Sequence, residues 1–299
     1  MPRAARVAQV VVDAIPTLYA CALVAYDGTA YHGFQYQVGV PTIQGTLEEA
    51  LQRFAEPVSR VVGAGRTDAG VHASGQVVAV RVRWRHSLES LLQAWNAHLP
   101  ADISVRGLVQ VPEGFHPRFS AVARTYRYWV YVDGTPATLP RPRRSPLTDR
   151  YALFEPRPLD VDRMNQAAAL LRGQHDFATF GQPTQGDSTV RRVDQAEWQV
   201  VETNLTPLDP FPGQHLVFTV TANGFLRQMV RALVGALLEV GRGRWSLEML
   251  ESALQARDRS QAPPPASPAG LVLERVHYPP GLAPFDGGDG SVPGGARPA

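Results

Sequence analysis

Apolar positions along the chain recur with two periods, and each period predicts a different element. Stretches that are apolar at every second position, or continuously apolar over a short run, predict β-strands. Stretches with apolar residues three or four positions apart predict helices. The predicted strands are 18–26, 77–82, 121–132, 190–201, 216–222 and 270–278. The predicted helices are about 43–54, 88–95, 160–172, 224–240 and 246–257.

Hairpin-like strands interleaved with helices predict an α+β fold with mainly antiparallel sheets, not a doubly wound parallel fold. We expect two such halves, an N-terminal domain over 17–117 and a C-terminal domain over 118–279. Residues 1–16 have few apolar positions to bury and predict a flexible arm. The Gly/Pro-rich residues 280–299 predict a disordered tail.

Composition narrows the class of protein. The chain has 299 residues, 44% of them hydrophobic, and no apolar run long enough to cross a membrane. A signal peptide is not evident, and the one cysteine, Cys21, excludes an internal disulfide framework. These features predict a cytoplasmic protein. The net charge is only +2, so binding to nucleic acid would depend on a local basic patch, and every basic residue is an arginine.

The glycine-rich stretch GAGRTDAGVHASGQV, residues 63–77, is the strongest candidate for chemistry. A phosphate cradle is disfavoured, because Asp68 stands where a dinucleotide fingerprint needs its third glycine, and no Gly-Lys-Ser/Thr follows. A metal site is disfavoured because Asp68 and His72 have no clustered partners. On spacing alone, a structural ion pair between Arg66 and Asp68 competes equally with a positioned carboxylate. Beside a guanidinium, such a carboxylate would be a nucleophile or a base.

The motif GRTDAGVHASGQ resembles the signature of the tRNA pseudouridine synthase A family, GRTDxGVHAxxQ. Six further blocks are similar to that family and follow in its order, from residue 18 to residue 279. They are YDGTAYHGFQYQ with TIQGTLEEAL, NAHLPADISV, GFHPRFSAVARTYRYWVY, GQHDFATF, GFLRQMVRALVGALLEVGRG and GLVLERVHYP. The proline-rich stretch APPPASPAGLVL and the long N-terminal arm depart from the family pattern, and we expect neither to touch the Asp68 loop.

The resemblance implies the pseudouridine synthase fold, with its catalytic cleft between the two halves. It also implies an isomerase that converts uridine to pseudouridine at positions 38, 39 and 40 of the tRNA anticodon stem-loop, without cofactor or metal. Asp68 matches the family's catalytic aspartate. Attack on the ribose C1′, addition to the uracil ring and proton abstraction to form a glycal all remain open as its role.

The resemblance also implies a set of substrate-binding residues. Arg66 would pair with Asp68 and hold the extruded nucleotide, and Tyr126 would stack on the target base. Leu271 would line the same pocket, and Arg231 would lie near the cleft. Four further arginines are candidates for contact with the RNA backbone: Arg141, Arg143, Arg144 and Arg227. His72 and His175 are expected to be structural.

The family forms homodimers in which one tRNA contacts both subunits, so we expect a homodimer here. Symmetry would double each basic patch of a chain with low net charge. The alternative function is a tRNA-binding or folding module that keeps the shape without turnover. It is disfavoured because a pure binder does not need a carboxylate next to phosphate.

Overall fold

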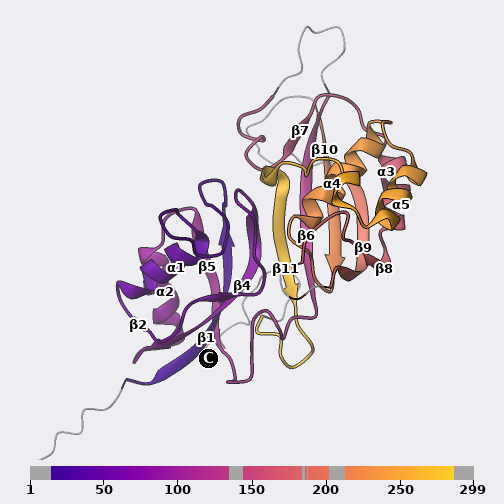
Figure 1. Cartoon of the computed structure of the whole chain (residues 1–299). Helices are drawn as coiled ribbons and strands as arrows, with labels where there is room; N and C mark the ends of the chain where they lie inside the picture. Colours follow the sequence, from indigo (N-terminus) through magenta and orange to yellow (C-terminus); the bar gives the residue numbers. More distant parts are fainter. Residues whose placement is uncertain (1–14, 135–143, 184–185, 187, 202–212, 286–299) are drawn as a thin grey trace, which may run out of the picture.

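One sheet of eleven strands connects the two halves of the chain (Figure 1). The computed structural model describes residues 15–134, 144–183, 186, 188–201 and 213–285. The predicted arm and tail therefore lie mostly outside the described residues. The α+β fold with mainly antiparallel pairing is confirmed, because only two strand pairs within these ranges, β4 with β11 and β6 with β7, are parallel.

The main path through the sheet has the order β5-β1-β4-β11-β6-β10-β9-β8. Its strands are β1 Thr17–Tyr26, β4 His72–Arg83, β5 Ile103–Gln110, β6 Ala123–Asp133, β8 Gly173–Asp176, β9 Val190–Val201, β10 Gly213–Ala222 and β11 Leu271–His277. Short strands β2 Glu56–Pro57 and β3 Val62–Gly63 pair with β4, and β7 Leu153–Glu155 pairs with β6. The last strand, β11, thus lies in the middle of the sheet between the two halves.

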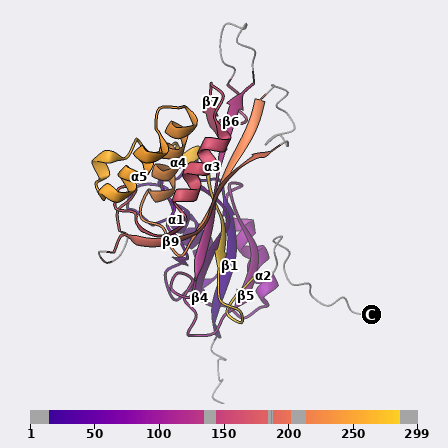
Figure 2. The same ribbon diagram turned by 90° about the vertical axis from the view of Figure 1, so that its right-hand side faces the viewer.

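Helices cover each half of the sheet. They are α1 Ile43–Gln52, α2 Leu88–His98, α3 Val161–Leu170, α4 Met229–Gly241 and α5 Leu247–Ala256, with single 3-10 turns η1 Arg259–Gln261 and η2 Pro268–Gly270. Figure 1 shows α1 and α2 on the N-terminal half, and Figure 2 shows α3, α4 and α5 gathered on one side of the C-terminal strands. Four helices begin at a side chain that accepts a backbone N–H, as helix N-caps do. These caps are Thr42, Ser87, Asp160 and Ser246.

The fourth helix differs from its prediction. The apolar spacing predicts a helix from residue 224, but α4 begins at Met229. Gln228 has a φ of 63°, a left-handed conformation that a right-handed helix cannot contain. Residues 224–228 instead form an irregular connection, in which Arg227 pairs with Gln182 in an isolated β-bridge, outside the helix that carries Arg231.

The predicted boundary near residue 117 falls in the connection between β5 and β6. Because β11 pairs with β4 on one side and β6 on the other, the two halves share one continuous sheet. Their division into two domains stays a prediction. Cys21 lies buried in β1, and its burial raises the pKa of the thiol. Within the described part of the chain, no helix is both long and apolar enough to span a bilayer.

The turn over residues 28–34 supports the loop that contains Asp68. Phe34 N–H donates to the Thr67 carbonyl oxygen at 3.0 Å, and Gly70 N–H donates to the Tyr31 carbonyl oxygen at 3.2 Å. Gly33 has a φ of +91°, and a Cβ there would lie 2.7 Å from the Thr67 carbonyl oxygen. The close approach of the two segments therefore requires glycine at residue 33.

Replacing Gly33 by alanine tests this support, and Gly39 provides a matched control. Gly39 also has a left-handed φ, +81°, but its added Cβ would meet nothing within 4 Å. We expect Gly39→Ala to lower the free energy of unfolding by about 1 kcal/mol, the ordinary cost of a left-handed alanine. Gly33→Ala should lower it by roughly 3 kcal/mol, because a steric clash is added. Denaturant unfolding measures both, and equal losses would contradict the support.

Candidate active site

Asp68 lies in the loop before β4, at the end of the central strands of the sheet, where two loops meet. Residues 64–71 lead into β4, and residues 264–270 lead into β11. Because β4 and β11 are parallel, with His72 opposite Val272, their preceding loops lie at the same end of the sheet. A Cβ on Gly70 would lie 3.0 Å from Pro268, which shows how closely the loops pack. The expectation that the proline-rich stretch does not touch the Asp68 loop is therefore wrong. The topology thus brings residues about 200 positions apart in sequence to one site.

Hydrogen bonds from buried side chains fix the Asp68 loop. The Gln76 side chain donates to the Gly65 carbonyl oxygen at 2.8 Å and accepts from the Gly65 N–H at 3.3 Å. The hydroxyls of Tyr26 and Thr67 lie 2.8 Å apart. Burial raises the pKa of Tyr26 to about 12. These bonds hold the backbone on both sides of Arg66, and neither Gln76 nor Tyr26 is among the predicted site residues.

Asp68 contacts a guanidinium from the other half of the chain. Arg231 Nη1 lies 3.4 Å from Asp68 Oδ2, and the two side chains are 16% and 28% exposed. Arg231 is held in turn by the Ala266 backbone, because its Nε donates to the Ala266 carbonyl oxygen at 2.8 Å. The Ala266 N–H donates to the Arg231 carbonyl oxygen at 2.9 Å. Arg231 thus lies beside Asp68, whose side chain stays partly exposed, and the placement of Arg231 near a cleft stays a prediction.

The predicted ion pair between Arg66 and Asp68 is wrong. Among the described residues no ion pair of Arg66 is found, and its side chain is exposed. Thr67, which lies between Arg66 and Asp68 in sequence, is buried and bonds to Tyr26. The Asp68 side chain contacts Arg231 of α4 rather than Arg66. Arg66 lies near Arg118, whose pKa is lowered by burial and by the positive charge of Arg66. Adjacency in sequence therefore gave the wrong partner for the carboxylate.

Tyr126 lies in β6 beside the Asp68 loop. Its ring packs edge-on against Phe225 at 5.1 Å between centroids, and a Cβ on Gly65 would lie 3.7 Å from its hydroxyl. Burial raises the pKa of Tyr126, and the Tyr26 and Asp68 groups add to the rise, so the hydroxyl is neutral. The β11 residue opposite Tyr126 is Leu273.

Leu271 is buried and lies two pairs further along the ladder, opposite Tyr128, and its place in a substrate pocket stays a prediction. Leu273 is the apolar residue that approaches Gly65, with its Cδ2 3.8 Å from a Cβ placed there. Alternation along β11 puts both leucines on one face, so the sequence pattern alone did not distinguish them. The apolar side of the site is therefore formed by Tyr126, Leu273 and Phe225.

Arg124 joins three segments around the site, a role that no pattern in the sequence indicates. Its Nη2 donates to the carbonyl oxygens of Ala64 at 3.0 Å and Arg118 at 2.7 Å. Its Nη1 donates to the Asn223 carbonyl oxygen at 3.2 Å. Burial lowers the pKa of Arg124. The side chain thus ties the Asp68 loop to the 116–120 turn and to the connection that precedes α4.

The other basic candidates are dispersed. Arg144 forms an ion pair with Asp149, at 2.8 Å between Nη2 and Oδ2, and Arg227 is exposed. Arg141 and Arg143 lie outside the described residues. Arg191 approaches the connection before α4, since a Cβ on Gly224 would lie 3.6 Å from its Nε.

Both candidate histidines have structural partners. His72 Nδ1 lies 3.1 Å from Asp27 Oδ1 and also faces the Gly28 N–H, while His175 Nε2 faces the Arg172 carbonyl oxygen at 2.8 Å. Burial lowers the pKa of His72. In the described ranges no three His, Cys, Asp or Glu side chains are grouped as they would be around a metal ion.

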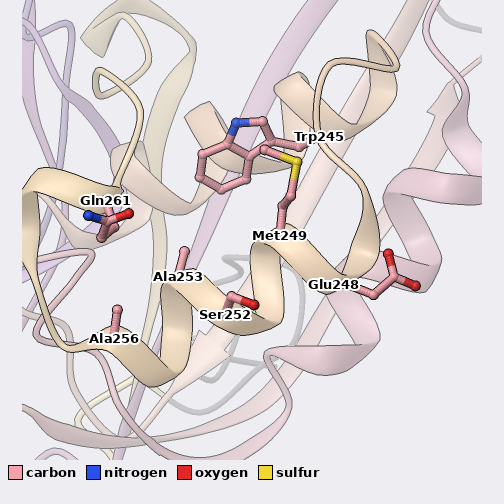
Figure 3. A pocket seen from close by; sticks show the side chains of 7 residues that line it. All are labelled: Trp245, Glu248, Met249, Ser252, Ala253, Ala256 and Gln261. Atoms are coloured by element: carbon pink, nitrogen blue, oxygen red, sulfur yellow. The ribbon is translucent and has the colours of Figure 1, made fainter.

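A separate surface groove of about 430 Å³ lies along α5 (Figure 3). Trp245 and Met249 line the same end of it, and Ala253 and Ala256 line it further along the helix. None of the predicted site residues lines this groove. The groove is therefore not the place where Asp68 would meet a substrate.

Comparison with known proteins identifies the family. The family model for tRNA pseudouridine synthase matches residues 22–120 and 167–279. A protein of Chloroflexus aurantiacus named tRNA pseudouridine synthase A is 43% identical over 87% of this chain and 88% of its own. A protein of Pseudothermotoga lettingae with the same name is 39% identical over 86% of this chain and 98% of its own. A third, of Paraburkholderia phymatum, is 40% identical over 90% of this chain and 94% of its own.

The chain belongs to the tRNA pseudouridine synthase family. It is an enzyme that isomerises uridine to pseudouridine in tRNA, as the resemblance of its motifs predicts. A solved structure, the archaeal box H/ACA sRNP Nop10-Cbf5 complex, matches at 12% identity and a TM-score of 0.29, over 81% of this chain and 60% of that chain. That likeness is too low to support any inference.

Replacing Arg231 tests whether its contact with Asp68 matters to this synthase. We expect Arg231→Gln to lower the single-turnover rate at saturating enzyme by about 100-fold, a typical cost of removing one aligned charged donor from a reaction centre. Arg163→Gln is the control, because Arg163 is also the third residue of a helix, α3, but is exposed and, in the described part of the chain, forms no ion pair with Asp68.

The free energy of unfolding is measured for both variants, so that a misfolded Arg231→Gln protein is recognised. An Arg231→Gln variant that folds and reacts as fast as Arg163→Gln would show that the contact has no part in the reaction.

Proposed function

We propose that this synthase modifies uridines at positions 38, 39 and 40 of the tRNA anticodon stem-loop, and that the Asp68 carboxylate is its catalytic group. The observation that carries the proposal is the placement of Asp68. Its side chain is partly exposed, contacts Arg231 and lies beside the apolar wall that contains Tyr126. The exposed side of the Asp68 carboxylate can contact a substrate, while the Arg231 guanidinium places a positive charge on its other side.

The reaction breaks the bond between N1 of uracil and C1′ of ribose and forms a bond between C5 and C1′. The C5 hydrogen leaves as a proton, and N1 gains a proton, so no electrons are exchanged with another reactant. A negatively charged carboxylate is the form that can attack C1′, add to the uracil ring or remove a ribose proton. The contact with Arg231 suits all three roles, and the choice among them stays open.

The target uridine must leave the helical stack to reach Asp68. Enzymes that act on a base inside a helix extrude it and hold it between aromatic and apolar side chains. Tyr126 and Leu271, together with Leu273 found here, would form this wall, and Arg66 would hold the extruded nucleotide at the cleft mouth. Arg227 and the 141–144 arginines, Arg141, Arg143 and Arg144, would contact phosphates further along the RNA.

We also propose that the synthase acts as a homodimer, with one tRNA contacting both subunits. A net charge of +2 gives one chain little general attraction for RNA, and two-fold symmetry doubles every local basic patch. Sedimentation equilibrium in the absence of tRNA should therefore give twice the mass of one chain. A monomeric mass in the presence of saturating tRNA would contradict this part of the proposal.

Release of tritium from uridine C5 tests the catalytic assignment. Three tRNAs are prepared, each with tritiated uridine at one of positions 38, 39 and 40, and a fourth with the label at another uridine. We expect wild type to release label from the first three only, because only a new bond at C5 expels that hydrogen. Asp68→Asn should release at least 1,000-fold less, since the nearly isosteric amide is not a nucleophile or base.

Asp194→Asn is the matched control, because Asp194 is an exposed aspartate on β9. This variant should behave as wild type, and Asp68→Asn should still bind tRNA. Release by Asp68→Asn at the rate of the control would disprove the role of Asp68. Release from the fourth tRNA alone would disprove the assigned positions.

A further inference from the structure

Phe119 is an exposed aromatic residue in a turn that Arg124 joins to the Asp68 loop. Its side chain is 65% exposed, more than any other Phe, Tyr or Trp in the described ranges. It lies in the turn over residues 116–120, between β5 and β6. A single exposed apolar residue is ordinary on a protein surface. The surroundings of Phe119 are what distinguish it.

The turn holds the ring rigidly. The N–H groups of Arg118 and Phe119 both donate to His116 Nδ1, at 3.1 and 3.2 Å. The His116 N–H donates to the Ser120 hydroxyl at 3.0 Å, and the Ser120 N–H donates back to the His116 carbonyl oxygen. The imidazole ring packs against the Phe119 ring, with centroids 4.3 Å apart and planes 33° apart. One side of Phe119 is thus supported, while most of the ring faces solvent.

The turn is also fixed to the Asp68 loop, and it carries positive charge. Arg124 donates to the carbonyl oxygens of both Arg118 and Ala64, which joins the two segments directly. The guanidinium of Arg118 lies 5.8 Å from the Phe119 ring, and Arg66 is close to Arg118. An exposed aromatic ring beside one arginine, with a second arginine near the first, matches the surfaces that bind single-stranded nucleic acid, where bases stack and phosphates are neutralised.

We propose that Phe119 stacks on the tRNA base next to the target uridine, with Arg66 and Arg118 contacting the adjoining phosphates. Extruding a uridine leaves its neighbour without a stacking partner, and an aromatic side chain that replaces the partner offsets part of this cost. This inference rests on the proposed function, because it takes Asp68 as the point to which the uridine is drawn. It adds a residue that stabilises the opened RNA without touching the reacting atoms.

Three variants test the proposal in the Asp68→Asn background, where turnover does not interfere. Phe119→Ala removes the ring, Phe119→Trp keeps an aromatic surface, and Val122→Ala removes an exposed apolar side chain three residues away. We expect Phe119→Ala to weaken tRNA binding by about ten-fold, as loss of one stacked base does. Phe119→Trp should bind as tightly as the unmodified background, and Val122→Ala should differ little from it.

Two further measurements are specific to stacking. With 2-aminopurine placed next to the target uridine, binding should quench its fluorescence when residue 119 is Phe or Trp and not when it is Ala. Phe119→Ala should leave the salt dependence of binding unchanged, because the ring neutralises no phosphate, whereas Arg118→Gln should lower the log–log slope by about one.

Equal binding by Phe119→Ala and Val122→Ala, or no change in 2-aminopurine fluorescence, would overturn the proposal. So would conversion of a dimer to a monomer by Phe119→Ala in sedimentation, since the ring would then pack against a second copy of the chain. Binding and fluorescence do not depend on catalysis by Asp68. A negative result for Phe119 is therefore distinguishable from a negative result for the proposed function, which would appear as tritium release by Asp68→Asn.

Discussion

The contact between the Asp68 carboxylate and the Arg231 guanidinium is the interaction on which the rest of this structure depends. It joins residues 163 positions apart, one in the loop before β4 and one in the first turn of α4. A partly exposed carboxylate stays ionised beside a counter-charge, and that counter-charge must leave the exposed side of the carboxylate open if a substrate is to reach it. Arg231 fulfils this requirement because the backbone of Ala266 directs its side chain from behind.

The sheet provides the frame for this contact. The parallel pairing of β11 with β4 places the loops before the two strands side by side, and the antiparallel pairing with β6 brings Tyr126 opposite Leu273. Buried polar groups then fix the loops, with Gln76 on Gly65 and Arg124 on Ala64. A buried hydrogen bond costs free energy when it is broken, so these residues resist movement of the site. The site is thus rigid because it belongs to the core of the fold.

Local sequence patterns predict most of the helices and strands, but few of the hydrogen bonds and ion pairs that form the site. The alternation over 121–132 matches β6 Ala123–Asp133, and the helix expected from Ser246 begins there because its side chain caps the first turn. Helical spacing continued back to Phe225, yet α4 begins at Met229, since periodicity does not report the left-handed backbone of Gln228. The prediction of Arg66 as the partner of Asp68 fails for a related reason, because a local pattern does not report which distant segments meet. Sequence proximity favoured Arg66, whereas sheet order decides which guanidinium reaches the carboxylate.

The most direct test of the account is a structure of the Asp68→Asn protein bound to tRNA. We expect a uridine of the anticodon stem-loop out of its stack, with the ribose C1′ and uracil C5 next to the residue 68 amide. Arg231 should lie behind that amide, and Tyr126 beside the base. A complex in which the target uridine stays stacked and no nucleotide reaches residue 68 would contradict the account.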